Sequence, residues 1–139
     1  MMSSKKKTYL LEYAGKKQRF ARSVVAGDFV FLSGSSGRTI ATGEVSSNDA
    51  GDQTKVALEK VKHALEEAGS SMENIIKVQI LFKDMKDYEK VKQAEFDFYK
   101  KHAPALAEEP AASTVWQVVS LSKPDMLVEF DIIALRGDL

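Results

Sequence analysis

Glu129 is the residue whose type and position best suit it to chemistry. It lies in the middle of an alternating apolar run, residues 126–135, that is typical of a strand buried on one face. One face of that strand would carry Val128, Phe130, Ile132 and Ala134, and the other Leu127, Glu129, Asp131, Ile133 and Leu135. A carboxylate held among apolar neighbours can orient or deprotonate a water. A structural ion pair or a bond to backbone would also place a carboxylate there, and the residues alone favour that simpler interpretation.

Three other features could serve binding or catalysis, but the residues around them favour a structural role. The stretch SGSSG, residues 33–37, offers backbone N–H groups to an anion, but it lacks the lysine and the following helix of a phosphate loop, so we predict a turn. The stretch 110–114 leads into a strand, yet its side chains Ala111, Ala112, Ser113 and Thr114 are small. Trp116 at the centre of that strand is interpreted as a packing residue.

The composition excludes several classes of function. The 139 residues contain no cysteine, which rules out disulfides, thiolate catalysis and cysteine-ligated zinc. His63 and His102 are the two histidines, so we expect no histidine-based metal site. Twenty basic residues balance twenty acidic ones, which makes nucleic acid an improbable partner. No apolar run reaches the roughly 18 residues of a membrane helix, and the first residues do not resemble a secretory signal, so we expect a cytoplasmic protein.

The order of predicted elements defines the fold class. Strands are expected on both sides of the turn at Ala26-Gly27-Asp28, and a short further strand around Gly43. A helix should start within 46–52 and end at Gly69, and a second should run from Asp84 or Asp87 to about His102. Strands are expected at 74–84, 114–121 and 126–135. The order β-β-(β)-α-β-α-β-β predicts an α+β two-layer sandwich, with a six-stranded mixed sheet and two helices on one face.

The domain organisation follows from the same elements. Residues 1–16 would form an N-terminal tail and the start of the first strand, and residues 17–139 a single domain. Two helices cover one face of a sheet, so the half-apolar second face should pack against further copies of the chain. Acids on that face indicate a partly wet pocket between subunits.

Four stretches together resemble the YjgF or Rid (reactive intermediate deaminase) family, also labelled endoribonuclease L-PSP. They are VVAGDFVFLSG, ALEKVKHALEEAGSSMENIIKVQILFKDMKDYEKV, PAASTV and DMLVEFDIIA, in the family order from about Phe20 to Ala134. The resemblance implies a chorismate-mutase-like fold and a homotrimer with three clefts between subunits. It also implies hydrolysis of 2-imino and 2-enamino acids to 2-keto acids and ammonia, without cofactor or metal.

The resemblance assigns roles residue by residue, with three departures. Glu129 matches the glutamate that positions the attacking water, and Ser33 and Gly34 match the Ser-Gly after the second strand. The family arginine that clamps the substrate carboxylate is Ala112 here, next to Thr114. The family tyrosine is Phe20, and a common asparagine is Lys92. Lys92, Arg38 or Arg22 are candidates to replace the missing arginine.

Three functions are compatible with these residues. The first is a divergent imine or enamine deaminase with weakened activity on 2-imino acids, acting through Glu129 in a cleft lined by Phe20, Ala112 and Thr114. The second is a non-enzymatic trimer that binds a metabolite or regulates a partner. The third, RNA cleavage, is disfavoured by the zero net charge and by the lack of interleaved aromatic and basic residues.

Overall fold

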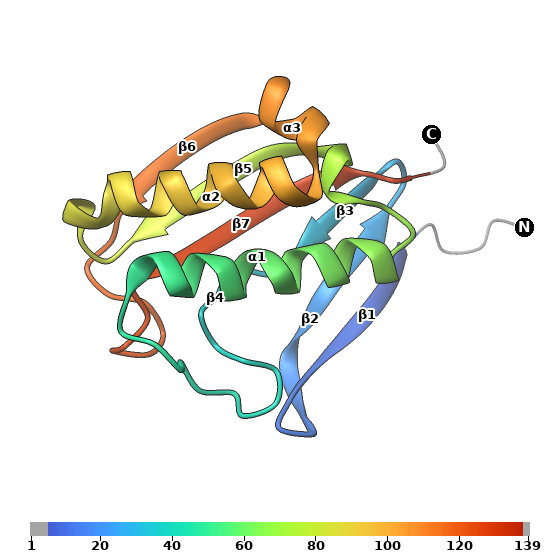
Figure 1. Cartoon of the computed structure of the whole chain (residues 1–139). Helices are drawn as coiled ribbons and strands as arrows, with labels where there is room; N and C mark the ends of the chain where they lie inside the picture. The colour runs from blue at the N-terminus through green and yellow to red at the C-terminus, as the bar shows by residue number, and fades with distance from the viewer. Residues whose placement is uncertain (1–5, 138–139) are drawn as a thin grey trace, which may run out of the picture.

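The chain folds into one mixed sheet with its two long helices, α1 and α2, side by side across one face (Figure 1). This computed structural model describes residues 6–137. The elements are β1 (Lys6–Tyr13), β2 (Lys16–Ala26), β3 (Phe29–Leu32), β4 (Ser35–Ser36), α1 (Ala50–Glu67), η1 (Met72–Asn74), β5 (Ile75–Phe82), η2 (Met85–Asp87), α2 (Tyr88–His102), α3 (Pro104–Glu108), β6 (Ala112–Gln117) and β7 (Val128–Leu135). The predicted α+β class and two-layer arrangement are confirmed.

The sheet of the described residues has seven strands instead of the predicted six. Its order is β1-β2-β3-β7-β5-β6, and β4 pairs with β7. β5 and β6 run parallel, and the other pairs are antiparallel. Two strands, β4 and β1, were not predicted, and the short strand expected around Gly43 is only an isolated bridge between Arg38 and Val45. β1 lies in a stretch that the sequence pattern assigned mainly to a tail. It pairs with β2 through a two-residue turn in which Ala14 and Gly15 have positive φ angles of 53° and 75°. Alanine seldom adopts this conformation, so the residues of the turn do not indicate a hairpin.

The helices begin and end where their capping residues predict. The Asp49 carboxylate accepts a hydrogen bond from the backbone N–H of Asp52 at 2.9 Å and caps α1. Gly69 follows α1 with a φ of 80°. The Asp84 side chain caps the 3-10 turn η2, which leads directly into α2. The short helix α3, which starts at Pro104, was not predicted.

The core lies between the helices and one face of the sheet. The β7 residues assigned to the helix side are all buried, as predicted: Val128, Phe130, Ile132 and Ala134. Val78, Ile80 and Phe82 extend this layer on β5, which lies between β6 and β7. The α1 stripe of Ala57, Leu58, Val61, Ala64 and Leu65 packs against them in the same buried cluster.

The opposite face of the sheet is left uncovered by the described chain. Phe29 and Phe31 on β3 are 39% and 43% exposed, although apolar burial should favour covering them. Trp116 on β6 is 53% exposed, and its indole Nε1 donates to Oε1 of Gln79 at 3.0 Å. Trp116, which was interpreted as a packing residue, is therefore about half exposed in the protomer. This exposed face is called the open sheet face below, with Phe29 and Phe31 on β3, the part-exposed Ile133 that pairs with Phe31, and Trp116 further along the sheet on β6.

Gln53, a buried amide on α1, holds together the two loops that flank the candidate site. Its Nε2 donates to the carbonyl oxygens of Ser47 at 2.8 Å and Asp125 at 2.9 Å. Its Oε1 accepts from the backbone N–H of Leu127 at 2.8 Å. The loop before α1 and the loop before β7 are thus fixed to the same side chain. In residues 6–137, no helix is both long and apolar enough to span a bilayer.

Candidate functional site

A hollow of about 340 Å³ opens beside Glu129, and residues from both ends of the chain line it. Its lining side chains include an acid, a guanidinium, a phenol and several hydroxyls. The lining residues are Tyr13, Phe20, Ser33, Gly34, Ser36, Arg38, Ser122, Met126 and Glu129. We call this hollow the Glu129 cleft. Four of the residues predicted to form the site therefore lie together in one protomer: Glu129, Phe20, Ser33 and Gly34.

Glu129 is held in place by its strand neighbours. It pairs with Ser36 of β4 and with Leu81 of β5. Gly34 lies against its carboxyl, and a Cβ added at Gly34 would overlap Oε2 of Glu129. Glycine is therefore required for this close approach. The SGSSG stretch contains the short strand β4 instead of the turn that we predicted.

Burial raises the pKa of the Glu129 carboxyl above its usual range. The nearby Lys60 opposes this effect, Asp131 adds to it, and Arg38 opposes it. The carboxyl therefore accepts and releases a proton closer to neutral pH than an exposed glutamate does.

Tyr13, at one edge of the cleft, is in contact with two cations, Arg38 and Lys60. The guanidinium carbon of Arg38 is 4.0 Å from the centre of the Tyr13 ring, within cation–π range. Lys60 rises from α1, and its ammonium donates to the Tyr13 hydroxyl at 3.0 Å. Burial, Arg38 and Arg22 lower the pKa of Lys60 to about 7, against the opposing effect of Glu129. Burial likewise raises the pKa of Tyr13, which keeps the phenol protonated at neutral pH.

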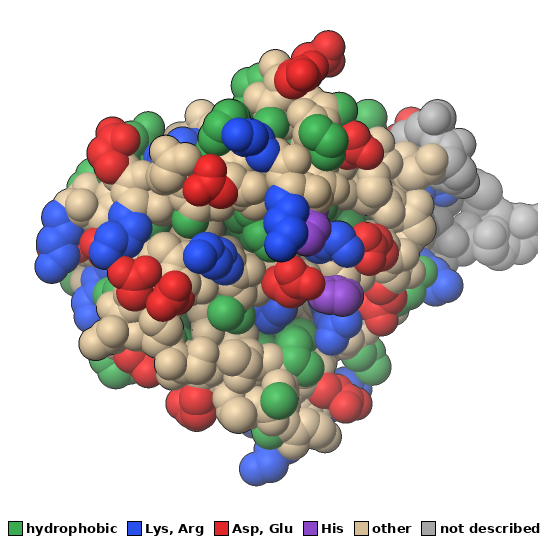
Figure 2. Space-filling model, in the orientation of Figure 1, with side chains coloured by type: hydrophobic (Ala, Val, Ile, Leu, Met, Phe, Trp, Pro, Cys, Tyr) green, Lys and Arg blue, Asp and Glu red, His purple; other side chains and the backbone are tan. Residues whose placement is uncertain are grey.

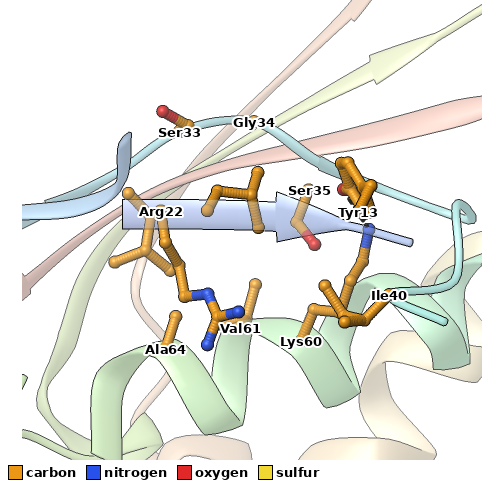
Figure 3. Close-up of a pocket in the computed structure, with 11 residues that line it drawn as sticks. Tyr13, Arg22, Ser33, Gly34, Ser35, Ile40, Lys60, Val61 and Ala64 are labelled. Atoms are coloured by element: carbon orange, nitrogen blue, oxygen red, sulfur yellow. Dashed lines mark hydrogen bonds between the residues drawn. The ribbon is translucent and has the colours of Figure 1, made fainter. Parts of the chain in front are cut away.

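A second, smaller cavity of about 30 Å³ lies behind Tyr13, between α1 and the sheet (Figure 3). Arg22 from β2 and Lys60 from α1 both point into it, and Ser33 and Gly34 separate it from the cleft. Arg22 forms an ion pair with Glu67 at 3.6 Å, while its buried Nε has no hydrogen-bond partner. The cavity is large enough for about one water.

The other three predicted site residues lie elsewhere in the protomer. The Lys92 ammonium forms an ion pair with the buried Glu95 carboxyl at 2.7 Å, in a different pocket beside α2. Ala112 and Thr114 lie on β6, where Thr114 accepts a hydrogen bond from Lys77 at 3.0 Å. Ala112 pairs with Lys77, and Lys77 pairs with Ile133. Ile133 is ~13 Å along β7 from Glu129 at roughly 3.3 Å per residue. Ala112 and Glu129 therefore share a sheet face but no hollow within one protomer.

Sequence reasoning missed Tyr13, Ser36, Ser122, Met126 and Lys60, and it named Arg38 only as one of three possible cations. Tyr13 was placed in a tail, and Lys60 was not distinguished from the other polar residues of its helix. The two histidines remain outside the site: His63 pairs with Glu59 at 3.3 Å on the exposed side of α1, and the His102 ring packs 4.4 Å from that of Phe98. Among residues 6–137, no group of three or more His, Asp or Glu side chains is placed to hold a metal.

The protein is thus a two-layer α+β sandwich with a carboxylate-lined cleft at one side. The family model for endoribonuclease L-PSP matches residues 14–136. The chain therefore belongs to the endoribonuclease L-PSP family, which also contains YjgF and reactive intermediate deaminases.

The alignments with proteins of related sequence cover most of this chain. A RutC family protein of Pyrococcus horikoshii is 32% identical, over 84% of this chain and 86% of that protein. TdcF of Escherichia coli, described as a reactive intermediate deaminase, is 33% identical over 85% of this chain and 87% of its own length. The crystal structure of E. coli TdcF with bound serine superposes with a TM-score of 0.81 at 27% identity, covering 94% of this chain and all of that one. The human 2-iminobutanoate/2-iminopropanoate deaminase is 25% identical over 86% of this chain.

Proposed function

We propose that the chain forms a homotrimer that hydrolyses the C=N bond of a small imine, or of an enamine after tautomerisation, to a carbonyl compound and ammonia. The observation that carries this proposal is the half-buried Glu129 carboxyl, which lies in an open hollow against Gly34 and has a raised pKa. The relatives that are named as deaminases of reactive intermediates support the reaction class.

The reaction requires two proton transfers to the nitrogen, and the proposal assigns both to Glu129. A water oxygen attacks the imine carbon, and the carboxylate accepts a proton from that water and passes it to the imine nitrogen, which gives the carbinolamine. The carbon–nitrogen bond of the resulting carbinolamine then breaks. The nitrogen takes up a proton and leaves as ammonia, while the oxygen forms the carbonyl group and releases its own proton. A carboxyl with a raised pKa serves as base in the first step and as acid in the second.

The assembly is proposed from the open sheet face. Phe29, Phe31 and Trp116 form an exposed apolar surface that would be covered by a second copy of the chain. Ala112 and Thr114 lie on the same face as Glu129 but too far away within one protomer, so they would contribute to the cleft of a neighbouring subunit. A mass measurement by light scattering should give three copies. A monomer at all concentrations tested would refute this part of the proposal.

The activity is tested by ammonia release from freshly generated imines. We expect turnover that falls by about 100-fold or more in Glu129→Gln, within the range for loss of a general base. The substrates should include 2-iminopropanoate and an imine without a carboxylate, because Ala112 leaves no clamp at the family position. Ala112→Arg should raise turnover of 2-iminopropanoate. If Glu129→Gln leaves the turnover of every imine unchanged, the proposed reaction is wrong.

A metabolite-binding trimer without catalysis is the second candidate. It is favoured by Ala112 and Phe20, which lack the guanidinium and the hydroxyl expected at those positions. A small molecule that stabilises the protein against heat, without any turnover in the ammonia assay, would establish this function instead.

A further inference from the structure

Neither of the two cations beside Tyr13 forms a direct ion pair with another described residue, although both lie within the electrostatic influence of the Glu129 carboxyl. The ion pairs formed within residues 6–137 involve neither Arg38 nor Lys60. The two positive groups lie on the same aromatic ring, at 4.0 and 5.3 Å from its centre, although their charges repel each other. A half-buried excess of positive charge at the edge of a hollow is suited to an anionic ligand.

The Arg38 guanidinium is oriented by contacts that leave its outer edge available. Its Nε donates to the Gly43 carbonyl at 2.8 Å, and its plane packs on Tyr13. In the described part of the chain, no hydrogen bond uses its two terminal nitrogens. A guanidinium fixed in this way binds a carboxylate or a similar oxyanion through two parallel hydrogen bonds.

Tyr13 can add a third hydrogen bond because of Lys60. An ammonium group can only donate, so the Lys60–Tyr13 bond of 3.0 Å uses a lone pair of the phenol oxygen. The phenol hydrogen is then left for another acceptor, and none of the hydrogen bonds found in residues 6–137 uses it. Tyr13 lines the same hollow as Arg38 and Glu129.

We propose that Arg38 and the Tyr13 hydroxyl form an anion-binding site for the carboxylate of a small organic ligand, with Lys60 behind Tyr13 as a positioning residue. The inference rests on the proposed function, because it places the ligand in the Glu129 cleft. It assigns the charge that Ala112 cannot supply to a different element of the same chain. The reacting carbon of the ligand would then lie between Arg38 and Glu129.

The site should depend on pH through Lys60. Lys60 faces Tyr13 on β1, Arg22 on β2, Arg38 in the loop after β4 and Glu129 on β7. On its own helix, Glu59 and His63 share an exposed hollow with it and pair with each other. A bound anion favours the ammonium form, whose pKa without ligand is about 7. Carboxylate affinity should therefore weaken as the pH rises through 7.

The test compares binding of 2-oxobutanoate and of its neutral amide, 2-oxobutanamide, by titration calorimetry. The wild-type protein should prefer the anion by roughly 10- to 150-fold, the range for a hydrogen bond to a charged group. Arg38→Gln should remove most of this preference, and Arg38→Lys should keep part of it. Arg19→Gln is the matched control, because Arg19 is an exposed arginine on β2 outside the lining of the cleft.

Two further variants separate positioning from catalysis. Lys60→Met should weaken anion binding and remove its dependence on pH near 7. Lys62→Met, on the same helix but paired with Glu66 at 3.0 Å, should change neither. Glu129→Gln should lower turnover by about 100-fold or more while it keeps or raises the preference for the anion, because it removes a negative charge beside the site.

The outcomes distinguish this inference from the proposed reaction. If the anion preference depends on Arg38 but no imine is hydrolysed, the inference stands and the reaction is refuted. If imines are hydrolysed but Arg38→Gln keeps the preference, or if the wild-type protein does not prefer the anion, the inference is overturned and the reaction stands. If Arg38→Gln fails to fold, Arg38→Lys replaces it in the test. Lysine lacks the guanidinium fork, so this variant should still reduce the preference for the anion.

Discussion

Replacing Gln53 with alanine should destabilise the protein and disturb the Glu129 cleft at the same time. Gln53 is 1% exposed and makes three hydrogen bonds, to Ser47, Asp125 and Leu127. Each such bond contributes about 1 kcal/mol net, so their loss amounts to ~3 kcal/mol. The free energy of unfolding should fall by that amount, which lowers the midpoint of urea unfolding by roughly 1–3 M at the usual dependence on denaturant.

The measurement is urea unfolding at one fixed protein concentration, since assembly would make stability depend on concentration. Gln18→Ala is the control, because the Gln18 amide makes an exposed bond to the Lys16 carbonyl and should change stability by less than about 0.5 kcal/mol. Met126 lies between two Gln53 partners and lines the cleft, so Gln53→Ala should also reduce turnover. A loss of stability below about 1 kcal/mol, or one equal to that of the control, would refute the role assigned to this amide.

Two other perturbations test the site directly. Gly34→Ala should keep the fold but move the Glu129 carboxyl, since the new methyl overlaps only the flexible end of that side chain; ammonia release should fall tenfold or more with little change in Tm, and unchanged turnover would show that the close contact is unimportant. The unfolded chain should bind more protons than the folded one between the folded pKa of Lys60, about 7, and its ordinary value of 10.5. Stability should therefore rise with pH across that window, and Lys60→Met should flatten the rise; an equal rise in the variant would show that Lys60 is not its source.

The fold could be predicted where local patterns and packing agree. The alternation of β7 and the stripe of α1 each mark a face that is buried in the structure, and Asp49 and Gly69 bound their helix as capping rules require. β1 was missed because its hairpin uses Ala14 at a positive φ, where glycine or asparagine would have signalled a turn. β4 was missed because its two serines are held by pairing with β7 and by the bond from Ser35 to the Ala57 carbonyl at 2.7 Å. Neither the pairing with β7 nor this hydrogen bond produces a periodic pattern in the amino-acid sequence.

The site was only partly predictable for the same kind of reason. Glu129, Ser33 and Gly34 could be found because their positions along the strands match a family pattern. Tyr13 and Lys60 could not be found in this way, because 47 residues separate them in sequence. Only the packing of the β1–β2 hairpin against α1 brings them within hydrogen-bond distance. Lys92, which matches a family position, forms its ion pair with Glu95 on α2 instead of entering the cleft of its own protomer.

The proposed anion site would allow function to persist despite the altered motif. A ligand is bound by groups that meet in space, and a hollow of about 340 Å³ is small enough for a guanidinium on any of its walls to reach the ligand. Ala112, which would reach the cleft only from a neighbouring subunit, brings no charge, whereas Arg38 and Tyr13 line the cleft with a guanidinium and a phenol. Glu129 is common to both arrangements. Whether the protein prefers an anionic ligand should therefore depend on which part of the cleft carries the cation. Comparing the anion preference of Arg38→Gln with that of Ala112→Arg measures this dependence. Arg38→Gln should remove the preference, and Ala112→Arg should add a clamp at the family position.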